Sequence, residues 1–461
     1  PSRHILGFAV PMLFGMLFQQ FYNLVDTIIV GKTLGVEALA GVGATGSINF
    51  MIIGFCMGVC NGFVIPVAQC FGAKKPADLR KYVFNGYICS IVFAILLTLA
   101  SVIFCRRILI IMNTPADIID HAYNYIVVIF IGIPTVFLYN MVSGVIRSLG
   151  DSKTPVVFLV LSSIINVVSL TAAKLPIALG VGGCIVLSGT DISAGRVVGL
   201  TACIAAALLQ ATDYVNKLFP NLETVPVWAA FLAAIAVGAA VGFVNGFFVA
   251  KFKLHPFIVT LSTQLIAFGA VLMFLMVGNN NGQTLSGLDS SYTEFIRGSL
   301  FSVGGVAVPK YVLYSAVLTV LMWVVWNKTK FGKRMFAVGS NEEAARISGI
   351  NVFATVVGVF VLAGAMYGVT GFIEGARIAS CSANTGLTYE SDAIAACVIG
   401  GVSFVGGTGN IGGIVIGVLL LQLIFVGLNF LSVSANMLYV IKGAIILAAC
   451  AVDMRKYLNR R

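Results

Sequence analysis

Residues 226–250 read PVWAAFLAAIAVGAAVGFVNGFFVA, a run of apolar residues that contains no charged side chain. About 20 consecutive apolar residues suffice for a helix to cross the hydrocarbon core of a membrane. The run does not alternate between apolar and polar residues, as the strands of a membrane barrel do. Because the backbone of a segment in lipid must satisfy its own hydrogen bonds, this run is predicted to be a membrane-spanning helix.

Similar runs recur along the chain of 461 residues, of which 59% are hydrophobic and 10% charged, with a mean hydropathy of +1.02. Soluble proteins carry about 25% charged residues. The sequence therefore predicts an all-α polytopic membrane protein with about 14 spanning segments. They are expected at residues 8–30, 44–71, 84–105, 122–145, 155–171, 175–190, 197–211, 226–250, 255–277, 311–327, 352–374, 391–405, 410–431 and 435–452.

The net charge of +11 is concentrated in short loops between the apolar runs. Lys and Arg in short loops mark the cytoplasmic side of a membrane protein. We therefore expect the loops around residues 74–81, 251–253 and 328–334 and the C-terminal residues 455–461 to face the cytoplasm. The polar stretch 279–310, which has few basic residues, is expected outside. No separate basic domain exists, so nucleic-acid binding is not expected.

The first apolar segment carries Gln19, Asn23 and Asp26 on one helical face, together with Tyr22. A carboxylate inside a spanning helix is costly, so it usually faces a polar cavity and serves ion or substrate transport. The alternative is that Asp26 lies near the outer interface and is solvated there. Both interpretations remain open from the residues alone.

The N-terminal third resembles a known transporter family. The matching stretches are FQQFYNLVDTIIVGKTLGVEALAGVGATGSI from residue 18, GVCNGFVIPVAQCFGAKK from residue 58 and IRSLGDSKTPVV from residue 146. They resemble the MATE family of multidrug and toxin efflux proteins, and the resemblance implies that Asp26, Asn23 and Gln19 belong to a cation site. Intact members have about twelve helices in two lobes. Residues 1–170 are predicted to supply about five helices of one lobe.

A Gly-bounded stretch, GTDISAG, interrupts the apolar pattern at residues 189–195. Gly breaks a helix, and the side-chain oxygen of Thr190 or Asp191 can cap the next one. One interpretation is an ordinary interfacial cap. The other is a hinge between two half-helices on a transport path. Under the second interpretation the path residues are Gly189, Thr190, Asp191, Ser193 and Gly195.

The loop NKTKFGKRMFAVGSNEEAARISGIN, residues 327–351, predicts a short amphipathic helix in the cytoplasm. Ser340 and Glu343 have the spacing of a capping box, in which both side chains bond the first helix amides. Ala344, Ala345 and Ile347 offer a small apolar face. Gly349 is a typical C-terminal stop.

The segments GTDISAGRVVGL (189–200), NKTKFGKRMFAVGSNEEAARISGINV (327–352) and ESDAIAACVIGGVSFVGGTGNIGGIVIGVLL (390–420) resemble a second family. They are very similar to the permeases of galactose/methyl-galactoside ABC importers, whose kin carry ribose, xylose and arabinose. Residues 171–461 are thus expected to form a permease-like domain of about nine segments that lacks the first helix. The resemblance also implies a loop that docks on the ATPase. Its residues are Ser340, Asn341, Glu342, Glu343, Ala344, Ala345, Arg346, Ile347 and Gly349.

The resemblance implies a permease homodimer in a bacterial inner membrane, surrounded by lipid. It also implies a cytoplasmic ABC ATPase and a periplasmic or lipid-anchored sugar-binding protein. No cofactor is expected on the chain itself, since ATP would act through the partner. The stretch GGTGNIGG lacks the Lys of a phosphate-binding loop.

Three functions remain in competition: a sugar-import permease, a cation-coupled efflux protein, and a fusion or gene-prediction artefact without transport activity. An enzyme is disfavoured, because the scattered His4, His121 and His255 form no metal-ligand spacing and no nucleophile–base motif is present. No metal site is expected. The ten cysteines lie mostly in apolar runs and are predicted to be small packing residues.

Overall fold

A computed structural model describes residues 36–112, 114, 119–151, 153–214, 217–223, 225–278, 280, 282–303, 306–430 and 435–458. The chain divides into two compact units, residues 1–163 and 164–461. Helix α6 (Lys153–Val186) continues through the boundary. Below, residues 1–163 are called the N-terminal unit, and residues 164–461 are called the permease unit after the resemblance described above.

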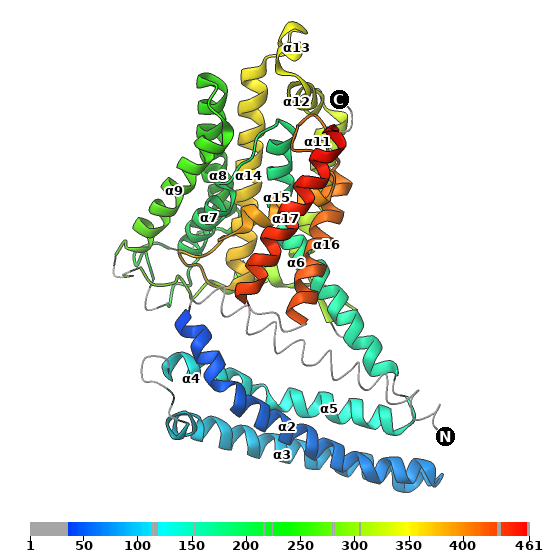
Figure 1. The fold of residues 1–461 in the computed structure, drawn as a ribbon. Helices are drawn as coiled ribbons and strands as arrows, with labels where there is room; N and C mark the ends of the chain where they lie inside the picture. Colours follow the sequence, from blue (N-terminus) through cyan, green and yellow to red (C-terminus); the bar gives the residue numbers. More distant parts are fainter. Residues whose placement is uncertain are drawn as a thin grey trace. The chain divides into compact units, whose positions relative to one another are not determined.

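Long apolar helices build the N-terminal unit (Figure 1). They are α2 (Val36–Gly72), α3 (Pro76–Ile111), α4 (Ile119–Ile131) and α5 (Ile133–Ser148). The axis bends by 44° between α4 and α5, at Gly132 and just before Pro134, which lacks a backbone N–H. The buried core of this unit includes Cys56, Cys60, Ile126, Phe137 and Met141.

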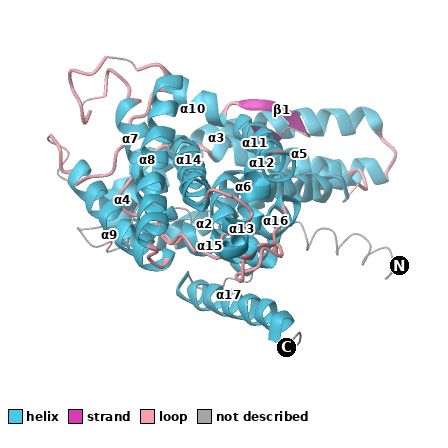
Figure 2. Cartoon of the chain, turned by 90° about the horizontal axis from the view of Figure 1, so that it is seen from above, coloured by secondary structure: helices cyan, strands magenta, loops and turns pink. Residues whose placement is uncertain are grey.

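The permease unit is also mainly helical, with one short strand pair among its described residues (Figure 2). β1 (Ser299–Val303) pairs antiparallel with β2 (Val306–Pro309). After α6 the helices are α7 (Ala194–Leu208), α8 (Val227–Phe252), α9 (Pro256–Leu275), α10 (Ser290–Arg297), α11 (Lys310–Lys328), α12 (Lys330–Ser340), α13 (Glu342–Ile347), α14 (Val352–Ile378), α15 (Tyr389–Ile399), α16 (Ile411–Phe430) and α17 (Ala435–Leu458).

Helices α8 and α14 pack through small residues at the centre of the permease unit. A Cβ added to Gly238 of α8 would lie 2.2 Å from the carbonyl oxygen of Gly364 of α14. A Cβ added to Gly364 would lie 2.1 Å from the carbonyl oxygen of Gly238. The buried positions of α8 include Ala230, Ala234, Gly238, Gly242 and Gly246, spaced by four residues. Such a stripe lets two membrane helices approach until their backbones touch.

An all-α polytopic membrane protein is confirmed, but the predicted count of about 14 segments is not. In the described part of the chain, eight helices are long and apolar enough to cross a membrane, or up to nine if α4 and α5 form one bent span. The expected segments 155–171 and 175–190 fall on one continuous helix, α6, which ends at Val186. Lys174 between them finds polar partners without breaking the helix. The expected segment 8–30 lies outside the described residues.

Candidate functional site

The break between α6 and α7 falls at residues 187–193, and its local geometry differs from the prediction. Neither Thr190 nor Asp191 is the capping residue of α7. Ser193 occupies that position, and its side chain makes no capping bond. Asp191 instead folds the loop, since its Oδ1 accepts hydrogen bonds from the backbone N–H of Ser193 at 2.9 Å and from Ser193 Oγ at 2.6 Å.

This loop joins a buried polar network that reaches three other helices. Tyr367 of α14 donates its hydroxyl to Asp191 Oδ2 at 3.2 Å. Asn245 of α8 donates its Nδ2 to Ser193 Oγ at 3.1 Å, and Thr263 of α9 donates to Asn245 Oδ1 at 2.5 Å. Asp191 and Ser193 have no solvent exposure. A polar network of this kind, at a break in a membrane helix, is typical of a transport path.

The first turn of α7 packs tightly against the segment that precedes α15. A Cβ added to Gly195 would lie 2.0 Å from Glu390 Oε2 and 2.4 Å from the carbonyl oxygen of Gly386. Only glycine fits without displacing these groups. The adjacent Arg196 donates to the carbonyl oxygen of Ala383 at 3.0 Å. The start of α7 is therefore held against the segment before α15 and the first turn of α15.

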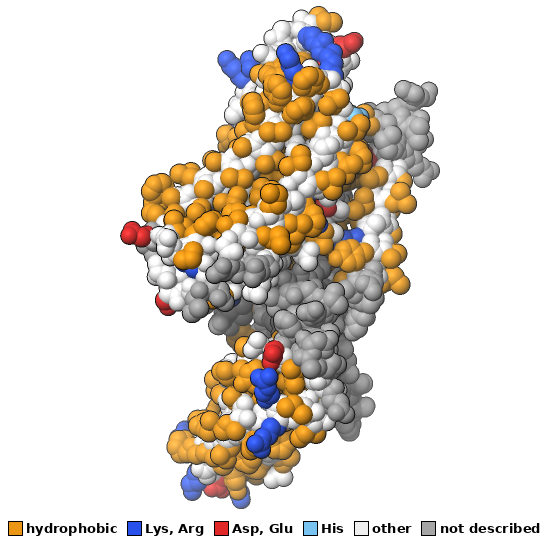
Figure 3. All heavy atoms as spheres, turned by 90° about the vertical axis from the view of Figure 1, so that its left-hand side faces the viewer, with side chains coloured by type: hydrophobic (Ala, Val, Ile, Leu, Met, Phe, Trp, Pro, Cys, Tyr) orange, Lys and Arg blue, Asp and Glu red, His pale blue; other side chains and the backbone are white. Residues whose placement is uncertain are grey.

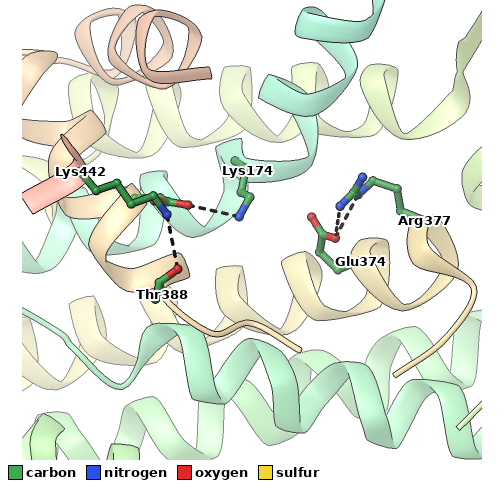
Figure 4. A network of polar contacts seen from close by, with 6 residues as sticks. Lys174, Glu374, Arg377, Thr388 and Lys442 are labelled. Carbon is green, nitrogen blue, oxygen red and sulfur yellow. Dashed lines mark hydrogen bonds and ion pairs between the residues drawn. The ribbon is translucent and has the colours of Figure 1, made fainter. Parts of the chain in front are cut away.

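A second group of buried charges lies around Asp392, near the start of α15 (Figure 4). Lys174 of α6 lies 3.6 Å from Asp392 Oδ2, and Lys442 of α17 forms an ion pair with Oδ1 of the same carboxylate. Lys442 also donates to Thr388 Oγ1 at 3.4 Å. The side chains of Lys442 and Asp392 are only 8% and 10% exposed. One carboxylate thus holds lysines from two different helices.

Glu374 and Arg377, near the end of α14, form a second ion pair in the same region (Figure 4). Arg377 Nη2 lies 2.8 Å from Glu374 Oε2, and the side chain of Glu374 is fully buried. Removing a charge from water costs several kcal/mol, so such groups are retained in pairs. Ion pairs inside a membrane helix bundle commonly mark substrate or ion pathways.

The sequence patterns did not predict this charge cluster, although each member is visible in the sequence. Glu374, Asp392 and Lys442 lie within or at the edge of predicted spanning segments, and Lys174 separates two of them. Ionisable residues in such segments are rare and usually paired. The signal was available, but the sequence does not say which charge meets which.

The predicted cytoplasmic helix exists as α13, with a different cap. Ser340 ends α12 and donates its hydroxyl to the carbonyl oxygen of Phe336 at 2.8 Å. Asn341 is the cap, because its Oδ1 accepts from the backbone N–H of Ala344 at 2.9 Å. The predicted capping box of Ser340 and Glu343 is therefore wrong, because Ser340 is already helical in α12.

The predicted stop at Gly349 is confirmed. Its φ is +78°, a left-handed conformation that glycine adopts readily. The N–H of Ile350 bonds to the carbonyl oxygen of Ala345, and the N–H of Gly349 bonds to that of Arg346, each at 3.0 Å. These two bonds form a Schellman motif.

The apolar face of α13 is smaller than predicted. Ala345 packs inward at 4% exposure, whereas Ile347 is 88% exposed and Ala344 is also exposed. Figure 3 shows Lys and Arg side chains gathered at this end of the permease unit, while its flank is largely apolar. The exposed basic residues here are Lys328, Lys330, Lys333, Arg334 and Arg346. A single exposed Ile does not by itself mark a docking surface, so the role of α13 is taken up below as a proposal.

The cation site implied for Gln19, Asn23 and Asp26 lies outside the described residues. The structure therefore does not place these side chains.

Comparison with known proteins identifies two families along the chain. Residues 163–450 match the family described as branched-chain amino acid transport system / permease component, and residues 11–170 match the MatE family. The chain thus joins a MATE-like segment to a transport permease segment, as the sequence predicted.

Two curated relatives extend over most of the permease match. The galactose/methyl galactoside import permease protein of Haemophilus influenzae is 41% identical over 305 residues, which cover 66% of this chain and 90% of the relative. The ribose import permease protein of Escherichia coli strain K12 is 35% identical over 303 residues, which cover 65% and 88%. A MATE crystal structure in the bent conformation matches 97% of both chains at 15% identity, with a TM-score of 0.34, too low to assign a common fold.

Proposed function

Because the chain belongs, through residues 163–450, to the family of transport-system permease components, we propose that it is the membrane-spanning permease of an ATP-driven sugar importer. The observation that carries the proposal is the 41% identity over 305 residues to a galactose/methyl galactoside import permease. The transported solute would be a monosaccharide of the galactose kind. The chain itself would form the path and would not be an enzyme.

The chemistry of the buried network suits a sugar, whereas the family description names branched-chain amino acids. Ser193, Asn245, Thr263 and Tyr367 supply hydroxyl and amide groups that can exchange hydrogen bonds with a neutral polyol. The carboxylate of Asp191 in the same network could also bind an ammonium group, so the preference for a sugar rests mainly on the similarity to the sugar permeases.

The helix α13 supports an ATPase partner on the cytoplasmic side. It is short, rigidly capped at both ends and carries the exposed Ile347. We propose that residues 340–349 dock on a separate ABC ATPase, which hydrolyses the ATP. A sugar-binding protein outside would deliver the solute, and two copies of the chain would form the permease in a bacterial inner membrane.

Uptake of radiolabelled galactose tests the proposal directly. The full chain is expressed in bacteria that lack their own galactose permease, together with the ATPase and binding protein of the same importer. We expect uptake that requires all three proteins and is absent when the ATPase carries a substitution in its phosphate-binding loop. No uptake above the cells without the chain, when the chain is present in the membrane, would contradict a working permease.

The MatE match over residues 11–170 keeps a second function in competition, cation-coupled efflux. The match covers about a third of the chain. Resistance of the expressing cells to cationic dyes would favour it, and unchanged sensitivity would disfavour it.

A junction of two families is also what an assembly or gene-prediction artefact produces. Amplification from source DNA across codons 150–190 decides this point. A product that spans the junction supports a real fusion, and failure with a positive control on each side supports an artefact.

A further inference from the structure

Cys203 and Cys381 lie together in the permease unit, although 178 positions separate them in the sequence. Cys203 is in α7, and Cys381 follows the end of α14. Neither side chain is exposed to solvent, and both belong to one packed apolar cluster with Leu285. Both thiols are free in the structure. Cys203 donates its thiol to the carbonyl oxygen of Ser382, the residue after Cys381, at 3.9 Å. A Cβ added at Gly375 would lie 3.4 Å from Cys381 Sγ and 3.6 Å from the carbonyl oxygen of Ala202, the residue before Cys203, so the two thiols are neighbours.

With the basic loop 327–351 on the cytoplasmic side, as the sequence predicts, the position of this pair along the helices puts it near the outer side of the membrane. α14 begins directly after the basic loop 327–351 and is 27 residues long, about 40 Å at 1.5 Å per residue. Its end at Ile378 therefore lies at the face opposite that loop. The backbone of Cys381 pairs with that of Leu285, in the polar stretch expected outside, through bonds of 2.8 and 2.9 Å.

The end of α7 meets the same outer stretch. The N–H of Asp289 donates to the carbonyl oxygen of Leu209 at 2.8 Å, and the N–H of Ala211 donates to that of Gly287 at 2.8 Å. Cys203 lies little more than one helical turn before the end of α7 at Leu208. Both thiols thus approach the outer compartment from inside the bundle.

We propose that Cys203 and Cys381 form a native disulfide that ties the outer end of α7 to the segment after α14. This proposal rests on the bacterial inner-membrane location proposed above, because the periplasm outside that membrane is oxidising. The two Cys S–H bonds break and one S–S bond forms. The two protons and two electrons pass to the disulfide of an exchanging oxidoreductase, which leaves as a dithiol. Because both thiols are buried, the bond forms before this part of the bundle closes.

The other cysteine pairs differ from this one in ways that make them controls. Cys56 and Cys60 are four residues apart on the single helix α2. Cys184 and Cys397 are both buried in the main cluster of the permease unit. Cys184 lies near the end of α6, where Val186 accepts a hydrogen bond from Gly407, and Gly407 packs against Ser340 of the cytoplasmic loop. The pair Cys184 and Cys397 therefore faces the reducing side.

Differential alkylation of the full chain tests the disulfide. Cells that express the chain are first treated with N-ethylmaleimide. After lysis, the protein is denatured in detergent that contains the same reagent, so that every free thiol is blocked. After reduction, the newly freed thiols receive deuterated N-ethylmaleimide, and mass spectrometry assigns the label at each cysteine. Cys203 and Cys381 should carry only the second label, and Cys184 and Cys397 only the first. A peptide pair linked through Cys203 and Cys381 should appear without reduction.

Two results would overturn the proposal. One is the first label on both Cys203 and Cys381 in the unaltered chain. The other comes from the variant Cys203→Ser, in which Cys381 should change to the first label. If Cys381 keeps the second label there, its partner is not Cys203. The measurement on the unaltered chain stands even if that variant does not fold.

Discussion

The two units of this chain use helices of similar hydropathy but treat charge differently. The span Thr45–Gly72 of the N-terminal unit has a hydropathy of 2.1, close to the 2.2 of α14 in the permease unit. In the N-terminal unit, the ion pair of Arg106 and Asp120 is 61% and 73% exposed. In the permease unit, the pair of Lys442 and Asp392 is 8% and 10% exposed. Helices of similar hydropathy can therefore differ in whether they bury charge. The permease unit buries this pair although its pair of Arg346 and Glu342 is exposed.

The glycines of the two units show the same contrast. A Cβ added at Gly46, Gly54, Gly58 or Gly62 of α2 would meet no atom within 4 Å, among the residues that the structure describes. At Gly238 and Gly364 it would collide with the backbone of the partner helix. The closely packed glycines Gly86 and Gly144 of the N-terminal unit meet side-chain atoms, whereas Gly238 and Gly364 bring two backbones together.

The largest expected effect concerns the buried carboxylate. Asp392→Ala leaves Lys442 and Lys174 without their shared counter-charge, and breaking a buried pair in this way costs about 3–5 kcal/mol. We expect a large fall in the unfolding temperature of the detergent-purified chain. The control Asp120→Ala removes an exposed pair and should cost no more than about 1 kcal/mol. Equal shifts for the two variants would remove the distinction between the units.

The next effect concerns α13, where two proline variants differ only in position. Ala345→Pro removes the hydrogen bond from Ala345 N to Asn341 O, 3.0 Å long, and proline inside a helix costs about 3 kcal/mol. Co-purification with the ATPase should be lost while membrane insertion is kept. Glu342→Pro is the matched control, since the first helical position tolerates proline and the preceding Asn341 is extended. Loss of the ATPase from both variants would not support a specific role for the helix.

A smaller effect is expected from one added methyl group. In Gly238→Ala, the new Cβ would lie 2.2 Å from the carbonyl oxygen of Gly364, so the two backbones must move apart. Overpacking of this kind costs about 1–3 kcal/mol. Gly54→Ala adds the same methyl group in open space and should be neutral or slightly stabilising, because alanine favours a helix. Thermal unfolding followed by size-exclusion chromatography compares the two. If Gly54→Ala lowered the unfolding temperature more than Gly238→Ala, α2 of the N-terminal unit would have to be packed at least as tightly as α8.

The smallest expected effect is that of Asp26→Asn on sugar uptake. If transport uses the permease unit alone, removing this charge should leave the uptake of radiolabelled galactose unchanged, and drug resistance should be absent with either residue. The same cells serve for both measurements. Drug resistance that the unaltered chain confers and Asp26→Asn abolishes would instead assign the transport function to the N-terminal unit.

Much of the fold follows from sequence patterns that are local. Apolar runs predicted the spanning helices, since hydropathy is a property of consecutive residues. The motifs of residues 327–351 predicted α13 and its stop at Gly349, because helix ends depend on neighbouring residues. The sequence predicted Ser340 as the cap of α13, but the cap is Asn341. The sequence did not reveal that α12 extends through Ser340.

The sequence by itself determined the membrane class, the two family resemblances and the short helix α13. Only the tertiary structure decided that Lys174, Asp392 and Lys442 share one site, that Asp191 bonds to Tyr367, and that Cys203 and Cys381 lie in one buried cluster. These contacts join residues from about 50 to more than 200 positions apart. Spacing within one segment fixes the face of a helix, but the partner of that face depends on how the helices pack, which no local pattern encodes.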